Sequence, residues 1–177
     1  STDEVYGDIP GNGFFTESTP LRPSNPYSAS KASADMLVQA MEGLFDQLYD
    51  HRCSNNYGPH QNSTSFLPLF ISRIIQNQKV PLYGDGSNIR DWLYVEDSCE
   101  AIWRIFTEAK NSSIYNVGGN NEHTNLEITK YILQYFHKDE SLIEFVKDRS
   151  GHDKRYAIDA TKIQEDLGWK ANTDFQI

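Results

Sequence analysis

Hydrophobic and polar positions follow two different periodicities along this chain, and together they predict alternating helices and strands. Between residues 66 and 76 the apolar positions recur every three or four residues, as on one face of a helix. Helices are predicted over residues 27–45, 66–76, 96–110, 124–137 and 161–167. Short strands are predicted over residues 80–83, 113–117, 142–146 and 155–158. Because the two element types alternate, the predicted fold class is α/β.

Polar residues mark the ends of several of these elements. Thr124 and Glu127 have the spacing of a capping box at the start of a helix. Gly168 follows the last helix, where a left-handed residue commonly ends one. Residues 7–26 and 54–64 are rich in turn-forming residues and predict long loops, which are often functional.

Composition narrows the class of protein. The chain has 177 residues and a formal net charge of -9, with a pI of about 4.9 and a mean hydropathy of -0.62. That acidity argues against nucleic acid or an anionic membrane as the main partner. No apolar run approaches the ~20 residues of a membrane helix, so a soluble, cytoplasmic protein is predicted. Two cysteines, expected to stay reduced, and five histidines without ligand spacing predict no metal site.

The pair Tyr27 and Lys31 is the strongest chemical candidate. Four residues apart on a predicted helix, the two side chains share one face. A lysine cation favours the phenolate, so we expect the pKa of Tyr27 to fall from its ordinary value near ~10. Such a phenol suits the removal of a hydroxyl proton. A solvated helix face is the simpler alternative for this motif taken alone.

Asp3 and Glu4 form a second candidate group. If Ser1 ends a strand, both carboxylates lie at the carboxyl edge of a sheet, where the ligands of open α/β folds gather. Two adjacent ionisable groups can supply a general acid and a general base. A solvated turn is the simpler alternative for an isolated Asp-Glu pair.

Six segments in fixed order carry a family resemblance. They are residues 2–7, 25–31, 53–59, 89–97, 115–119 and 151–156. Together they resemble the dTDP-glucose 4,6-dehydratases of the extended short-chain dehydrogenase/reductase family, over nearly the whole chain. The resemblance implies an NAD-dependent enzyme of deoxysugar biosynthesis, a homodimer, that oxidises C4 of a nucleotide sugar, eliminates water across C5–C6 and returns hydride to C6.

The same resemblance implies two lobes. An incomplete Rossmann-type parallel sheet holding NAD would comprise residues 1–52 and about 89–110. A smaller α/β lobe that binds the nucleotide sugar would comprise residues 53–88 and 111–177.

The resemblance also assigns catalytic roles. Tyr27 takes the C4 hydroxyl proton, and Lys31 lowers the pKa of Tyr27 and holds the nicotinamide ribose. Thr2 hydrogen-bonds the C4 oxygen. Glu4 removes the C5 proton, and Asp3 protonates the leaving C6 hydroxyl.

Binding residues follow from the same motifs. Asn56 matches a cofactor contact, in addition to Tyr27 and Lys31. Arg90 matches a contact to the diphosphate, which suits a forked guanidinium. Together with Thr2, the implied substrate contacts are Asn55, Phe66, Pro81, Leu82, Tyr83, Arg90, Asn125, Asp148, Arg149, Gly151 and His152. Phe66 belongs to a pair in which the family has a lysine, so one cation is missing there.

Each binding residue has a simpler structural alternative. Tyr83 is as compatible with the core as with a site. Arg90 can pair with the adjacent Asp91 at the surface, where such a pair contributes little. His152 can be a surface histidine, and Asn125 can serve only the start of its helix.

Two departures from the family pattern leave alternatives open. No glycine-rich dinucleotide fingerprint is present, and Gly11 and Gly13 do not replace it because they do not join a strand to a helix. We therefore expect the chain to be the C-terminal part of the enzyme, inactive alone. A UDP-sugar dehydratase, a 4-epimerase and a non-catalytic nucleotide-sugar-binding fragment remain alternatives, although an epimerase does not need the Asp3–Glu4 pair.

The segment 41–52 is the second departure. The family has a buried, β-branched strand leading into Cys53, but here Asp46, Asp50 and His51 interrupt it, with no Val or Ile. A buried parallel strand is expected to be almost continuously apolar. A divergent segment and a locally corrupted sequence both explain this pattern.

Overall fold

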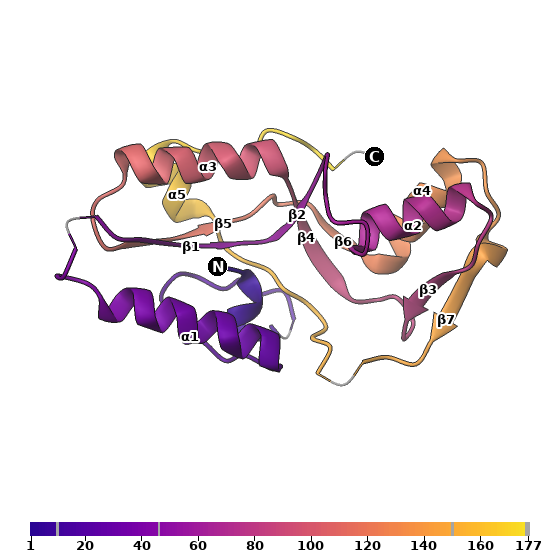
Figure 1. Cartoon of the computed structure of the whole chain (residues 1–177), viewed down its shortest axis with the longest axis horizontal. Coiled ribbons are helices and arrows are strands. Elements are labelled where there is room, and N and C mark those ends of the chain that lie inside the picture. The colour runs from indigo at the N-terminus through magenta and orange to yellow at the C-terminus, as the bar shows by residue number, and fades with distance from the viewer. Residues whose placement is uncertain (10, 46, 150, 176–177) are drawn as a thin grey trace.

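The computed structural model describes residues 1–9, 11–45, 47–149 and 151–175. Figure 1 shows an elongated molecule with two groups of helices and strands at opposite ends and a small sheet between them. Parallel strand pairs and surrounding helices confirm the predicted α/β class. Within the described residues, no helix is long and apolar enough to cross a membrane.

The first group is built on the strands β1 (Tyr49–Cys53) and β5 (Ser113–Val117), which pair in parallel. Helix α1 (Pro26–Ala40) lies on one face of this pair, and α3 (Val95–Glu108) with α5 (Thr161–Leu167) lies on the other (Figure 1). Side chains of α3, β5 and α5 share an apolar core with Trp169. The short 3-10 helix η1 (Asp3–Tyr6) lies beside α1.

A small sheet joins the two ends. Strand β4 (Ile89–Tyr94) pairs in parallel with β2 (Asn55–Tyr57) and antiparallel with β6 (Glu122–Thr124). Its aromatic residue Trp92 enters the core of the second group, while Leu93 enters that of the first. Because the side chains of a strand alternate between its faces, β4 contributes to both cores.

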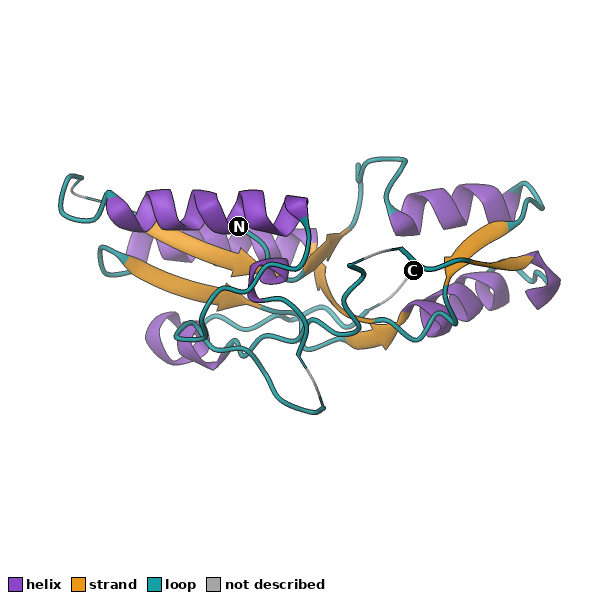
Figure 2. Ribbon diagram, turned by 90° about the horizontal axis from the view of Figure 1, so that it is seen from below, coloured by secondary structure: helices purple, strands orange, loops and turns teal. Residues whose placement is uncertain are grey.

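The second group contains α2 (Phe66–Ile75), β3 (Val80–Tyr83), α4 (Asn125–Tyr135), the 3-10 helix η2 (Glu140–Leu142) and β7 (Ile143–Val146). Strands β3 and β7 pair in parallel, and Figure 2 shows both helices beside them. The core here is large and apolar, with Phe70, Ile74, Leu82 and Ile132 at most 3% exposed.

Most predicted elements are confirmed, and their end signals explain why. Strands β3 and β5 have the predicted bounds, and α2, α3, α5 and β7 differ from them by at most two residues. The capping box at Thr124 is present, with the Glu127 carboxylate accepting from the Thr124 N–H at 2.7 Å. Gly168 adopts a left-handed conformation, with φ of 63°, at the end of α5.

Three secondary-structure predictions are wrong, and one segment that the sequence left open is a strand. Helix α1 ends at Ala40, five residues before the predicted end at 45, and turns follow. The predicted loop 54–64 begins with β2, a strand too short to show a periodicity. Residues 155–158 form two isolated bridges rather than a strand. The segment 41–52 contains β1 in spite of its charges; Asp46, one of the interrupting residues, lies outside the described residues.

The division into two lobes stays a prediction, but one pairing bears on its boundary. Strand β5 lies within the range 111–177 that was expected in the smaller lobe, yet it pairs along its whole length with β1. Hydrogen bonding therefore groups residues 113–117 with the first end of the molecule.

Candidate active site

Helix η1 brings Asp3 and Glu4 to the carboxyl end of β1. A parallel bridge joins Thr2 to Cys53, the last residue of β1. The Thr2 hydroxyl accepts a hydrogen bond from the Glu4 N–H at 3.4 Å and donates to Asp3 Oδ1 at 3.2 Å. Both carboxylates therefore lie at the sheet edge where open α/β folds bind their ligands.

Asp3 is a buried carboxyl with an unusually high proton affinity. Its side chain is 1% exposed, and Oδ2 has no hydrogen-bond partner among the described residues. Burial raises the pKa of Asp3 to about 7, helped by the charges of Asp91 and Glu4, while Thr2 and Arg90 act in the opposite direction. Near neutral pH a large fraction of Asp3 carries a proton, as a general acid requires.

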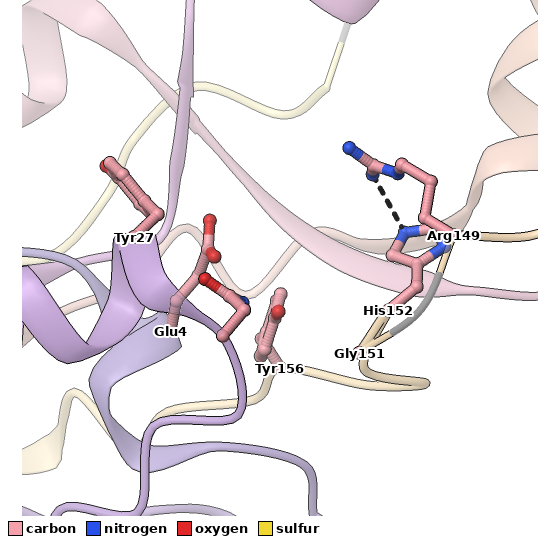
Figure 3. A pocket seen from close by; sticks show the side chains of 7 residues that line it. Glu4, Tyr27, Arg149, Gly151, His152 and Tyr156 are labelled. Atoms are coloured by element: carbon pink, nitrogen blue, oxygen red, sulfur yellow. Dashed lines mark hydrogen bonds between the residues drawn. The ribbon is translucent and has the colours of Figure 1, made fainter.

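Glu4 is less buried than Asp3 and faces a pocket. Burial raises the pKa of Glu4 from its ordinary value, opposed mainly by the charge of Arg90. The pocket, about 350 Å³ in volume, is lined by Glu4, Asn25, Tyr27, Arg149, Gly151, His152 and Tyr156. Figure 3 shows these side chains, which come from η1, the start of α1 and the segment 149–156. Asp3 does not line the pocket; it lies next to Glu4 in the chain, in the protein interior.

The first two turns of α1 present Tyr27 and Lys31. Asn25 caps the helix, its Oδ1 accepting the Ser28 N–H at 2.9 Å, and Pro26 occupies the first helical position. Tyr27 is 53% exposed, and Lys31 Nζ lies 5.8 Å from the centre of the Tyr27 ring. Tyr27 and one of the two carboxylates, Glu4, thus line one pocket, and Lys31 lies beside Tyr27 outside that lining.

The expectation of a lowered pKa for Tyr27 is wrong in this structure. Partial burial raises the pKa of Tyr27, and the charges of Glu4, Cys53 and Asp3 raise it further. Lys31 is exposed, so water screens its cation, whereas Asp3 and Glu4 act through the less polar protein. Spacing along the helix correctly predicted that Lys31 lies near Tyr27. It did not predict the carboxylates of Asp3 and Glu4, which come from another segment and raise the pKa of Tyr27.

Arg90 is buried behind the pocket, with 7% exposure. Its guanidinium donates to backbone carbonyls, including that of Asp153 at 3.0 Å, and lies 4.2 Å from the centre of the Tyr156 ring. The alternative of a surface ion pair with Asp91 is wrong. Asp91 is itself buried and accepts two backbone N–H groups of the 119–121 loop, each at 2.7 Å.

A polar cluster connects the end of β3 with the segment 148–152. His152 Nδ1 lies 2.6 Å from Asp148 Oδ1, and Arg149 Nη2 lies 3.2 Å from His152 Nε2. Burial lowers the pKa of His152, so the neutral ring donates from Nδ1 to Asp148 and accepts from Arg149 at Nε2. The Arg149 guanidinium also lies 4.8 Å from the centre of the Tyr83 ring. These four predicted binding residues are therefore neighbours, while Ser150 of the same segment lies outside the described residues.

Six other predicted binding residues lie outside the lining of this pocket. Leu82 is 1% exposed in the apolar core, and Phe66 packs with its ring centre 4.2 Å from that of Phe70. Asn56 donates to the Ser54 carbonyl at 3.1 Å. The others lie in β2, in β3 and at the start of α4: Asn55, Pro81 and Asn125. Their binding roles stay predictions.

The sequence predictions missed two residues of the pocket. Asn25 was recognised only as a residue before the helix, and Tyr156 only as the end of a motif. Tyr156 is 4% exposed, donates to Asp153 Oδ2 at 2.8 Å and stacks on Arg90. The signal for Tyr156 is an aromatic residue directly after the basic pair Lys154-Arg155, but its place beside Glu4 depends on the fold.

Parallel strand pairs flanked by helices, with a polar pocket at the carboxyl end of one strand, are typical of a Rossmann-like α/β fold. A family model described as GDP-mannose 4,6 dehydratase matches residues 1–177. The chain therefore belongs to the GDP-mannose 4,6 dehydratase family.

Individual relatives agree with this assignment. The chain is 48% identical over 182 residues to a dTDP-glucose 4,6-dehydratase of Neisseria gonorrhoeae, a match covering 96% of this chain and 53% of the relative. It is also 48% identical over 178 residues to the low-salt glycan biosynthesis protein Agl12 of Haloferax volcanii, covering 99% and 56%. The chain thus spans about half the length of the curated relatives it matches.

Solved structures give the same picture. DesIV, a dTDP-glucose 4,6-dehydratase of Streptomyces venezuelae with NAD and TYD bound, superposes with a TM-score of 0.94 at 41% identity, covering 98% of this chain and 54% of that one. A UDP-glucose 4-epimerase of Thermus thermophilus in complex with NAD has a TM-score of 0.90 at 28% identity, covering 99% and 58%.

Proposed function

We propose that this chain carries the substrate side and the reacting groups of an NAD-dependent dTDP-glucose 4,6-dehydratase. Relatives at 48% and 41% identity bear that name. The observation that carries the proposal is the pair Asp3 and Glu4 beside Tyr27. Asp3 has a pKa of about 7 and Glu4 faces the pocket, so one carboxyl can give a proton while the other takes one.

The residues at the start of α1 fit the nicotinamide end of NAD. Tyr27 is half exposed at the rim of the pocket, and Lys31 lies on the same helix face, free to hold a ribose hydroxyl. NAD, when bound, supplies a hydride acceptor for C4 and later a hydride donor for C6. Asn56, on the short strand β2 that follows β1, is proposed as a further contact on this side.

In the first step Tyr27 removes the C4 hydroxyl proton while C4 gives up hydride, which leaves a 4-keto sugar. Thr2 hydrogen-bonds the C4 oxygen. Because the protein alone raises the pKa of Tyr27, the phenolate that catalysis needs has to be stabilised by groups that are present when cofactor and sugar are bound. The positive charge of an oxidised nicotinamide and the neighbouring Lys31 act in that direction.

In the second step Glu4 takes the C5 proton, which the C4 ketone has made acidic. Asp3, whose Oδ2 has no hydrogen-bond partner among the described residues, gives its proton to the C6 hydroxyl once the bound sugar brings the two groups together, so that water leaves and a C5–C6 double bond forms. Hydride then returns to C6 and a proton to C5, which completes the 4-keto-6-deoxy product. The two carboxyls suit opposite tasks. Buried Asp3 keeps a proton that it can donate, whereas Glu4, which faces the pocket, can accept one.

Cations at the far side of the pocket fit the diphosphate. The Arg149 guanidinium lines it beside the neutral ring of His152, and a second cation, Arg90, lies behind Tyr156. In a chain of net charge -9, such a local group of cations is needed to hold a doubly anionic ligand. Tyr83 and Asp148 orient these groups from the end of β3 and from the segment 148–152.

We also propose that the enzyme is a cytoplasmic homodimer. Cys53 and Cys99 are unpaired thiols, in keeping with a reducing compartment. Met36 and Leu37 on α1 are 63% and 68% exposed, and such apolar side chains favour an interface. Light scattering that gives the mass of one chain would contradict the dimer.

Product analysis tests the proposed activity. The protein that contains this chain is incubated with NAD and dTDP-glucose, and the products are weighed by mass spectrometry. We expect a sugar lighter by one water. A C4 epimer of unchanged mass would support an epimerase instead, and a faster reaction of UDP-glucose would support a UDP-sugar dehydratase. No turnover at all, with nucleotide sugar still bound, would support a non-catalytic binding protein.

The carboxylate roles have their own test. Glu4→Gln and Asp3→Asn should slow elimination by about 10²–10⁴-fold without blocking the first oxidation. Absorbance of reduced nicotinamide should therefore rise and persist in both variants. Loss of that absorbance would show that these carboxylates act in the first step.

A further inference from the structure

A buried arginine on β1 holds three different segments together. Arg52 is 2% exposed. Its Nε donates to Asp35 at 3.1 Å, its Nη1 donates to the Tyr6 hydroxyl at 2.8 Å, and its Nη2 donates to Asp50 at 3.3 Å. Asp35, Tyr6 and Asp50 are at most 7% exposed, so the whole group is shielded from water.

Two of these three contacts lead to elements that carry reacting groups. Asp35 lies on α1, two turns after Tyr27, while Tyr6 is the last residue of η1, which begins with Asp3 and Glu4. Figure 1 shows α1 and the N-terminal segment on the same side of β1. One guanidinium therefore connects the helix of the candidate base with the turn of the two candidate carboxylates.

Within this chain, which spans about half the length of its relatives, apolar packing alone holds α1 weakly. Its buried residues, among those that the structure describes, are Ser28, Ala32 and Asp35. Ala32 is the single α1 member of the neighbouring apolar cluster, which contains Val5, Tyr6, Phe15 and Ile158. An alanine removes little apolar area from water, so the position of α1 depends strongly on its polar contact.

We propose that Arg52 is a positioning residue that sets Tyr27 relative to Asp3 and Glu4. The proposal rests on the proposed function of those three residues. The planar guanidinium suits this task because its donors point in fixed directions. It therefore fixes the distance between Asp35 on α1 and the Tyr6 hydroxyl on η1. A displacement of about 1 Å in a reacting group can cost ~10²-fold in rate.

The contacts of Arg52 with Asp35 and with Tyr6 predict different kinetic defects. Asp35→Asn removes the charge that ties α1 to Arg52, so it should slow the first oxidation about 10-fold, with KM almost unchanged. Tyr6→Phe removes the hydroxyl that ties η1 to Arg52 and, by donation to Asn116 Oδ1 at 2.7 Å, to β5, so it should slow elimination and let reduced nicotinamide accumulate. Neither residue lines the pocket.

Asp50→Asn is the matched control. It removes one carboxylate charge from the same guanidinium, as Asp35→Asn does, but Asp50 lies on β1 itself. Its own contact with α1 is at Gln39, at the opposite end of the helix from Tyr27. We expect a similar loss of thermal stability in the two Asn variants, with kcat lowered only in Asp35→Asn.

The experiment measures kcat, KM, the reduced-nicotinamide transient and the melting temperature of the three variants and the parent enzyme. Hydrogen exchange of the α1 amides supplies a measurement without turnover, and protection should fall in Asp35→Asn but not in Asp50→Asn. If all three variants lose kcat in proportion to stability, or if exchange of α1 is the same in both Asn variants, Arg52 has a purely structural role. A parent enzyme that does not dehydrate the sugar would instead overturn the proposed function, and the exchange data would still decide whether Arg52 holds α1.

Discussion

The two parallel strand pairs at the ends of this molecule are buried in opposite ways. In the β3–β7 pair, the buried residues of β3 are Val80 and Leu82. In the β1–β5 pair, the buried residues of β1 are Asp50 and Arg52. Both strands show the same alternation of buried and less buried positions. A strand can therefore be buried even when its inward side chains are charged, provided that each buried charge has a partner.

The kind of burial follows the proposed division of tasks. The end built on β1 and β5, called the polar end, positions Tyr27, Asp3 and Glu4, whose chemistry needs fixed distances and shifted proton affinities. The end built on β3 and β7, called the apolar end, supports Tyr83 and the segment 148–152, which are proposed to bind the nucleotide. Directional ion pairs suit the first task, and a dense apolar core suits the second.

The largest effect expected is at the polar end. Tyr27→Phe should lower kcat by about 10²–10⁴-fold, since no other hydroxyl or base on α1 replaces the phenolate. No reduced nicotinamide should appear, and the melting temperature should stay near that of the parent because Tyr27 is 53% exposed. Tyr83→Phe is the control at the apolar end and should leave kcat almost unchanged. A reduced-nicotinamide transient in Tyr27→Phe would show that another group starts the reaction.

At the apolar end the largest effect should be on stability. Leu82→Ala is expected to cost about 2–5 kcal/mol of the free energy of unfolding, because it opens a cavity in a core where Leu82 is 1% exposed. Urea unfolding measures this loss. The kcat of the folded fraction should be preserved, and a large loss of kcat at unchanged stability would mean that Leu82 has a direct part in catalysis.

A smaller effect is expected from pH, through Asp3. Its pKa of about 7 in the folded state lies above the ordinary 3.8, so the folded protein holds this proton more tightly than the unfolded chain. The resulting stabilisation is complete below about pH 4 and is lost as pH rises through 7, up to about 4 kcal/mol. Urea unfolding at pH 5 and pH 8 should show that Asp3→Asn removes this loss. An identical pH dependence in both proteins would mean that Asp3 has an ordinary pKa.

The smallest effect expected is at Arg90, which lies between the two ends. Arg90→Lys keeps the charge but loses the fork and the stacking on Tyr156, so KM for dTDP-glucose should rise about 10-fold. The diphosphate is remote from the reacting carbons, so kcat should change little. An unchanged KM in both Arg90→Lys and Arg90→Ala would limit Arg90 to supporting the backbone of residues 153–154.

The accuracy of the sequence predictions differs between the same two ends. Helix α2 and strand β3 have apolar spacing and clear end signals, and their bounds were predicted to within a residue. Strand β1 has no such spacing, and its charges suggested a divergent or corrupted segment. One of those charges, Asp50, belongs to the Arg52 network, and the other carboxylate of that network, Asp35, lies 17 positions before Arg52 in the chain.

The candidate site shows the same limit. The motifs predicted Glu4, Tyr27, Arg149, Gly151 and His152, and all five line one pocket. They did not predict that Tyr156 lies among them, that Arg90 stacks on Tyr156, or that the pKa of Tyr27 is raised. Each of these depends on which side chains approach from distant segments.

By itself, the sequence determined the α/β class, the elements with a regular apolar period and the set of residues able to do the chemistry. These properties are local, because periodicity and motif spacing lie within one element or turn. Only the tertiary structure decided how β1 is buried, which residues share the pocket and how the proton affinities of Asp3 and Tyr27 change. Burial and charge act through space and weaken with distance, so they depend on the fold that brings η1, α1 and the segment 148–156 together.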